Sequence, residues 1–119
     1  MIVRYIPADP AGNLTAIVLS PVAPQARAAV AARMMARCPE GFEQVGFAEE
    51  DSLTGEFPRL CMMGGEFCGN ALRCAGFYHA LRTGAQGKTC VFAEISGAEG
   101  VQPVMADTAA GEASTVMPL

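Results

Sequence analysis

The feature that most constrains the fold is a predicted helix, from about Gly69 to Arg82, that is apolar on most of its faces. Its apolar residues are Ala71, Leu72, Ala75, Phe77, Tyr78 and Leu81. Such a helix is usually buried, often wrapped by a sheet. The chain has 119 residues, 51% of them hydrophobic, which is enough for one domain with a core of this kind.

The rest of the chain predicts mostly strands. Runs rich in β-forming residues lie at 2–6, 14–19, 44–48, 59–63, 90–95, 101–105 and 114–117. A second helix, from Pro24 to about Arg37, is amphipathic, because Ala26, Val30 and Met34 recur at helical spacing before a Pro-Glu-Gly stop. Residues 106–111 predict a hairpin connection. The pattern predicts a mixed α/β fold, α+β-like, in which strands outnumber helices.

Composition narrows the class of partner. The net charge is −4 and no basic patch is present, so nucleic acid is not an expected partner. No apolar run approaches the roughly 18–20 residues that cross a bilayer, and the first residues predict a strand rather than a signal peptide. We therefore expect no membrane partner and a cytoplasmic location. Charged residues are only 17%, which indicates either a covered surface or simply an Ala- and Gly-rich composition.

The chain has five cysteines, an odd number that argues against a disulfide framework in a cytoplasmic protein. There is no CxxC pair and only one histidine, His79, so no metal site is expected. Cys61 and Cys90 fall in predicted strands and are expected to be buried, as is Cys74 in the predicted helix 69–82. Cys38 follows the predicted helix 24–37.

Cys68 stands apart from the other cysteines because it lies where a strand leads into the apolar helix, after Gly64 and Gly65. Glycines let the backbone turn sharply and let a ligand approach closely. A helix start offers free N–H groups and the positive end of the helix dipole, which favour a thiolate at Cys68. The same N–H groups, at Gly69 and Asn70, could hold a carboxylate. A cysteine that is only a poor cap with a buried side chain is the alternative from position alone.

The string from Gly65 to Cys74, Gly-Glu-Phe-Cys-Gly-Asn-Ala-Leu-Arg-Cys, resembles the active-site signature of the diaminopimelate epimerase family. The Gly12-Asn13 turn resembles that family's first substrate-binding turn, in the same order along the chain. Ala71 replaces the glycine that usually follows the Asn. With the Gly-Gly-Glu-Phe lead-in, this makes the chain more similar to a divergent branch that includes histidine racemases of opine-metallophore pathways.

The resemblance implies a bent mixed sheet around a central helix, with residues 1–119 as the N-terminal domain of a two-domain protein whose second domain is absent from this chain. It implies a cofactor-independent racemase or epimerase that inverts the α-carbon of a free amino acid, histidine or diaminopimelate-like. Cys68 would be one catalytic base, and Asn13, Gly69 and Asn70 would bind the substrate. The second catalytic cysteine would come from the second domain.

Geometry offers Cys68 no partner within the helix. Cys74 lies roughly 9 Å along the axis and about 120° around it, so it cannot face Cys68 across a substrate. His79 lies about 16 Å along the axis, which excludes a cysteine hydrolase dyad within the helix. The alternative to an enzyme is an inactive half-domain that binds ligand or dimerises, its partner being the missing domain or a second copy.

Overall fold

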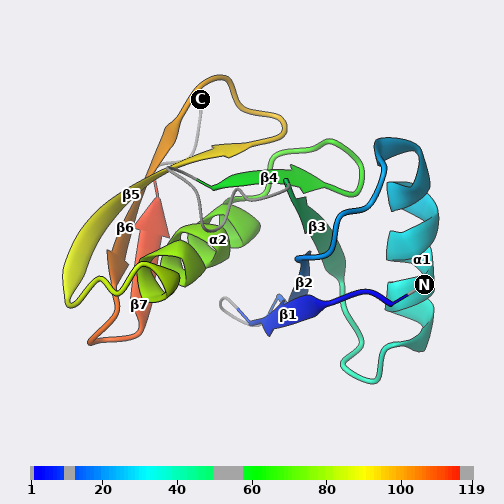
Figure 1. Ribbon diagram of the computed structural model, residues 1–119, viewed down its shortest axis with the longest axis horizontal. Coiled ribbons are helices and arrows are strands. Elements are labelled where there is room, and N and C mark those ends of the chain that lie inside the picture. The colour runs from blue at the N-terminus through cyan, green and yellow to red at the C-terminus, as the bar shows by residue number, and fades with distance from the viewer. Residues whose placement is uncertain (1, 10–12, 50–57, 116–119) are drawn as a thin grey trace.

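The computed structural model describes residues 2–9, 13–49 and 58–115. The elements follow the order β1 (Tyr5–Ala8), β2 (Thr15–Val18), η1 (Pro24–Ala26), α1 (Arg27–Arg37), β3 (Gln44–Ala48), β4 (Arg59–Met62), α2 (Gly69–Arg82), β5 (Lys88–Ile95), β6 (Gln102–Asp107) and β7 (Glu112–Thr115). Figure 1 shows the strands bent around α2, while α1 lies outside the bend. The predicted mixed α/β fold is confirmed.

The strands form one mixed sheet in chain order, β1 to β7. Neighbouring strands are antiparallel except at two places, where β2 runs parallel to β3 and β4 runs parallel to β5. A helix makes each parallel crossover, α1 between β2 and β3 and α2 between β4 and β5. The sheet is therefore built from two β-α-β units joined by the antiparallel β3–β4 pair.

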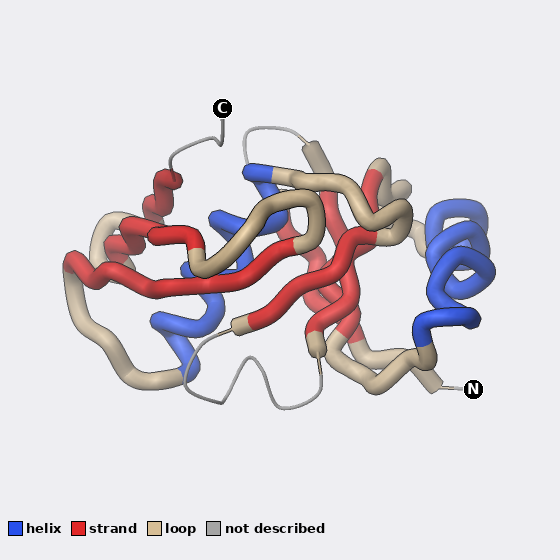
Figure 2. The backbone as a smooth tube through the Cα atoms, turned by 90° about the horizontal axis from the view of Figure 1, so that it is seen from above, coloured by secondary structure: helices blue, strands red, loops and turns tan. Residues whose placement is uncertain are grey.

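The two helices cover opposite faces of this sheet. Crossovers between parallel strands are right-handed. Both crossovers move in the same direction across the sheet, but β4 and β5 run opposite to β2 and β3. The two helices must therefore cover opposite faces. The packing agrees, because Val18 and Val45 pack with Met34 of α1, whereas Ile17 and Leu60 pack in the cluster around α2. Figure 2 shows α1 apart at one end of the molecule and α2 beneath the strands.

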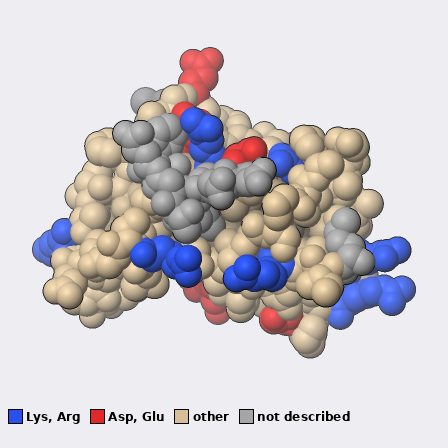
Figure 3. All heavy atoms as spheres, in the orientation of Figure 1, with Lys and Arg blue, Asp and Glu red and all other residues tan. Residues whose placement is uncertain are grey.

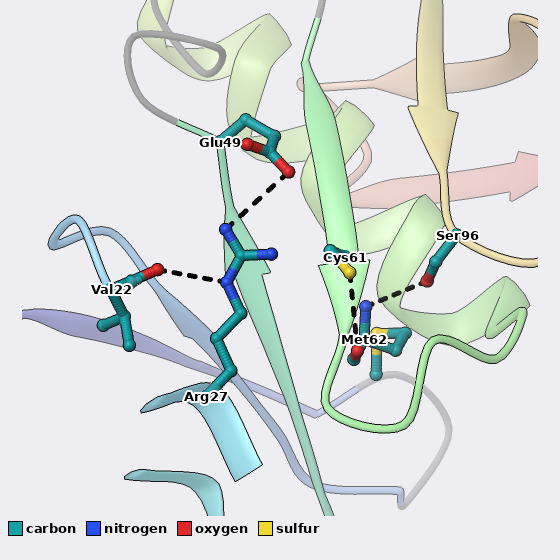
Figure 4. Close-up of polar contacts among 6 residues, drawn as sticks. All are labelled: Val22, Arg27, Glu49, Cys61, Met62 and Ser96. Atoms are coloured by element: carbon teal, nitrogen blue, oxygen red, sulfur yellow. Dashed lines mark hydrogen bonds and ion pairs between the residues drawn. The ribbon is translucent and has the colours of Figure 1, made fainter. Parts of the chain in front are cut away.

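Arg27, the first residue of α1, ties that helix to the sheet. Its Nε donates to the Val22 carbonyl at 3.1 Å and its Nη2 lies 3.8 Å from Glu49 Oε1 (Figure 4). Its guanidinium also stands 5.7 Å from the centre of the Phe47 ring on β3. These contacts fix the start of α1 above the sheet through hydrogen bonding, charge and ring stacking together.

The central helix α2 packs closely because small residues face the strands. A Cβ added at Gly76 would lie 2.6 Å from Val104 Cγ1 of β6, so glycine is what lets the helix and strand approach. Leu72 is fully buried. The expectation that α2 is buried on most faces is wrong at Leu81, which is 51% exposed, because the face carrying Phe77, Tyr78 and Leu81 lines a hollow between β1 and β7.

Strand boundaries differ from the prediction at both edges of the sheet. The first strand lies at 5–8 rather than 2–6 and includes Pro7, which an edge strand tolerates because one row of its N–H groups has no ladder partner. The last runs over 112–115 rather than 114–117, and residues 116 and 117 lie outside the described part. Gly111 ends the predicted hairpin connection, its N–H donating to the Asp107 carbonyl at 2.9 Å.

Within the residues described, no helix is long and apolar enough to cross a membrane. The face drawn in Figure 3 carries separated cationic and anionic groups with broad uncharged areas between them. Two large apolar side chains are exposed on neighbouring strands, Phe92 of β5 at 56% and Met105 of β6 at 53%.

Candidate functional site

Cys68 is the N-cap residue of α2. Its backbone is extended (φ −139°, ψ 106°), and its Sγ accepts a hydrogen bond from the Ala71 N–H at 3.4 Å. The side chain is 7% exposed. The sulfur thus occupies the place that a serine oxygen takes in an ordinary helix cap, with a helix N–H group directed at it.

The loop before Cys68 is fixed by the turn after β5. Ser96 Oγ accepts from the Met62 N–H at 2.9 Å (Figure 4) and donates to the Glu66 carbonyl at 2.7 Å. Gly97 has a positive φ of 78°, and a Cβ there would lie 2.9 Å from the Phe67 Cα. Only glycine permits this backbone contact, which sets the path of the chain into α2.

The predicted site residues come together in one hollow of about 450 Å³ at the start of α2. Its lining consists of Asn13, Gln44, Cys68, Gly69, Asn70, Arg73, Ser114 and Thr115. Asn13 precedes β2, whereas Gly69 and Asn70 form the first turn of α2. Asn13 and Cys68, which are 55 positions apart in the chain, therefore line the same hollow.

Gln44 links the two predicted parts of the site. Its Oε1 accepts from Asn13 Nδ2 at 3.1 Å and from Cys68 Sγ at 3.2 Å. It is the first residue of β3 and pairs in register with Thr15 of β2. Because β2 and β3 are parallel, Gln44 lies beside the turn that contains Asn13. Cys68, at the start of α2, contacts the same amide oxygen.

Arg73 brings the one cationic group among the described residues that line this hollow. Its Nη2 donates to Asn70 Oδ1, one turn earlier on α2. The Asn70 side-chain oxygen is thereby occupied, so the first turn of α2 presents its backbone N–H groups and a held guanidinium to the hollow. Both groups favour an anion.

The other four cysteines do not line the hollow with Cys68. All five are within the described part of the chain and are free thiols. The prediction that Cys90 is buried is wrong. It points away from the core on β5, which is covered on one face only, whereas Cys38, Cys61 and Cys74 are half-buried.

Cys74 packs against the core around α2, as predicted, and burial raises the pKa of its thiol from 9.0 to about 11. His79 is buried on α2 and is not among the residues that line the hollow. Among the described residues, no group of three or more His, Cys, Asp or Glu is arranged to hold a metal ion.

Ala71, where the resemblance departs from the usual signature, does not line the hollow. It is fully buried in the cluster around α2. Its methyl group therefore fills the core side of the helix, and the departure leaves the side that faces the hollow unchanged.

Four lining residues were not predicted from the sequence. Arg73 follows Asn70 by three positions on the same helix, so helical spacing was a usable signal. Gln44 begins a strand next to the one after Asn13, and recognising the parallel pairing would have found it. Ser114 and Thr115 reach the site only through the curvature of the sheet, for which the sequence carries no local signal.

The comparison with known families agrees with the geometry. Residues 2–116 match the family model described as the histidine racemase CntK N-terminal domain. The chain belongs to this family. The match spans Asn13, Cys68, Gly69 and Asn70, and it confirms the predicted resemblance to a histidine-racemase branch. No curated protein shows a significant sequence match to the chain.

Proposed function

We propose that this chain is the N-terminal half of a cofactor-independent amino-acid racemase, in which Cys68 is one of two catalytic bases. The observation that carries the proposal is the position of Cys68 at the cap of α2, in a hollow shared with Asn13, Gly69 and Asn70. The family's description as a histidine racemase domain supports a histidine-type substrate.

The substrate carboxylate would bind the N–H groups at the start of α2, at Gly69 and Asn70, with Arg73 nearby. Asn13 would bind the amino or carboxyl group, since an amide offers both a donor and an acceptor. In this arrangement the α-carbon would lie beside Cys68 Sγ. Fixed dipoles and the guanidinium then stabilise the charge that develops as the α-proton leaves.

The proton balance needs two bases on opposite faces of the α-carbon. One thiolate takes the α-proton, and the electron pair of the broken C–H bond stays on the carbon. The thiol on the other face gives its S–H proton to that carbon and becomes a thiolate. The product has inverted configuration, and the reverse reaction uses the two sulfurs in exchanged roles.

Independence from pyridoxal phosphate is part of the proposal. That cofactor is held through a lysine Schiff base. The single lysine of this chain, Lys88, lies exposed at the start of β5 and is not among the residues that line the hollow. The chain's own residues at the site are instead suited to carboxylate binding and proton transfer.

We further propose that the second thiol belongs to a second domain outside these 119 residues. Among the described residues that line the hollow, Cys68 is the only cysteine, and the family is described as an N-terminal domain. The second domain would close the hollow over the substrate and exclude water. An inactive half-domain that binds ligand or a second copy is the competing function.

Exchange of the α-proton with deuterated water tests the proposal. The intact protein, meaning these 119 residues together with the proposed second domain, is incubated with L-histidine and separately with other L-amino acids. Loss of the α-proton signal is followed by NMR. We expect exchange with histidine or a related amino acid, and slow or no exchange with residues 1–119 alone. An intact protein that exchanges no amino acid is a binding module rather than a racemase.

A further inference from the structure

The contact between Arg73 and Asn70 fixes which way the Asn70 side-chain amide faces. Arg73 Nη2 donates to Asn70 Oδ1, one turn earlier on α2. A guanidinium carries N–H donors and no acceptor. If the amide turned by half a turn, its NH₂ group would face those donors, and Arg73 has no group that could accept from it. The amide oxygen therefore faces Arg73, and the NH₂ group faces away from it.

The NH₂ group of Asn70 is left as a donor at the proposed substrate site. Asn70 is half-buried in the first turn of α2 and lines the hollow of about 450 Å³ that also contains Cys68. Within the described part of the chain, its Nδ2 atom donates to no acceptor. A ligand in this hollow can therefore supply the acceptor.

The backbone and the Asn70 side chain together offer donors at the start of α2. The N–H groups of Gly69 and Asn70 precede the first hydrogen bonds of the helix, and Asn70 Nδ2 adds a further donor. An ammonium group has no lone pair with which to accept, whereas a carboxylate accepts through two oxygens. This end of the hollow therefore favours the carboxylate of a zwitterionic amino acid over its ammonium group.

Arg73 lies where two hollows meet. It lines the polar hollow with Asn70, and it also lines the hollow of about 560 Å³ with Asp9 and Glu112. Among the described residues, its guanidinium is hydrogen-bonded to Asn70 and is in no ion pair with a carboxylate. This arrangement suits a residue that orients its neighbour on the helix.

We propose that Arg73 is a positioning residue that holds the Asn70 amide with its NH₂ group available to the ligand, so that the Asn70 side chain donates to a carboxylate oxygen of the substrate. The inference rests on the proposed racemase function and names the group that helps to select the substrate carboxylate. Arg73 acts through Asn70 and does not itself pair with the substrate.

The first measurement needs no ligand. The NH₂ signals of Asn70 are assigned in the ¹⁵N-labelled intact protein from their absence in Asn70→Asp, and ¹⁵N relaxation then reports how firmly the amide is held. We expect an ordered amide in the unsubstituted protein and a mobile one in Arg73→Met. Arg73→Lys, which keeps a donor without an acceptor, should restore part of the order.

Arg82→Met is the matched control, because Arg82 is exposed at the last residue of α2 and is not among the residues that line the polar hollow. It should leave the Asn70 amide as ordered as in the unsubstituted protein. An Asn70 amide that is equally mobile with and without the Arg73 guanidinium overturns the inference.

The second measurement is the dissociation constant of L-histidine for the intact protein, determined by calorimetry at 0.15 M salt, where charges at a distance are screened. Arg73→Met should weaken binding about tenfold, because the Asn70 donor is no longer held toward the ligand. In an Asn70→Ala background the same substitution should change binding less than about twofold. Asn70→Asp keeps the pairing with Arg73 but replaces the donor by a negative charge, and should weaken binding more than about tenfold.

Equal weakening by Arg73→Met in both backgrounds would mean that the guanidinium acts on the ligand directly, which overturns the inference. Failure of the intact protein to bind L-histidine overturns it as well. A protein that binds L-histidine and shows the expected coupling, but exchanges no α-proton, contradicts the proposed racemase function and supports this inference. Should Arg73→Met fail to fold, Arg73→Gln replaces it, since a glutamine lets the amide face either way.

Discussion

One cysteine caps the start of α2 and another lies within the helix, and the two line different hollows that offer different chemistry. At the first end, Cys68 lies in a polar hollow with Asn13, Gln44 and the open N–H groups of the first turn. Further along, Cys74 lies with Phe77, Tyr78 and Leu81 in a hollow of about 560 Å³ between β1 and β7, lined largely by apolar side chains.

The difference shows that position in a helix decides what a thiol can do. Only the first turn of a helix has N–H groups without intrahelical partners, so only a residue there has donors available for an anion. Cys74 has none of these, and its burial raises the thiol pKa to about 11. We therefore expect the start of α2, with Cys68, to carry the chemistry and Cys74 to contribute packing.

The largest expected effect is on catalysis. Cys68→Ser should slow α-proton exchange by the intact protein by at least about 10²-fold, because a serine hydroxyl at this position is a far weaker acid and base. Cys74→Ser should leave exchange within about threefold. Serine is also a good helix cap, so Cys68→Ser should not lower the melting temperature. Full exchange activity in Cys68→Ser would overturn the assignment of Cys68.

The next effect is on stability, measured by denaturant unfolding. Leu72→Ala removes a fully buried side chain of α2 and should cost about 2–5 kcal/mol. Leu81→Ala, at 51% exposure, should cost less than about 1 kcal/mol. A cost at Leu81 as large as that at Leu72 in the intact protein would mean that additional chain covers this hollow.

A glycine near each end of α2 gives a smaller contrast. Gly97→Ala should cost about 2–4 kcal/mol, because a positive φ of 78° is combined with a close approach to the Phe67 backbone before Cys68. Gly84→Ala, just after the far end, has the same φ of 78° but no atom within 4 Å of the new Cβ, and should cost about 1–2 kcal/mol. Equal costs would show that the Gly97 contact is dispensable.

The smallest effect is a pH dependence from Cys74. Folding raises its pKa from 9.0 to about 11, so above pH 9 the folded protein holds a proton that the unfolded chain has lost. Below pH 9, the ionisation of Cys74 should therefore cause no change in the free energy of unfolding with pH. Between pH 9 and 11, it should make that free energy fall as the pH rises. Cys74→Ala should reduce that fall, and an unchanged pH profile in this variant would contradict the raised pKa.

Local patterns determined much of this protein. The apolar residues of 69–82, the spacing of 24–37 and the alternating β-rich runs specified both helices and most strands. Gly69 and Asn70 could be assigned with Cys68 because neighbours in sequence at a helix start are neighbours in space. The edge strand containing Pro7 was misplaced, because proline signals a turn unless the strand lies at a sheet edge.

The tertiary structure alone decided how the hollow is completed. Gln44 reaches Cys68 because β2 and β3 are parallel and α2 crosses the opposite face from α1. Ser114 and Thr115 arrive from β7, and this depends on the curvature accumulated over the whole sheet. Such contacts arise from strand pairing and packing between segments far apart in the chain, where the local residue pattern carries no record of which strand will be the neighbour.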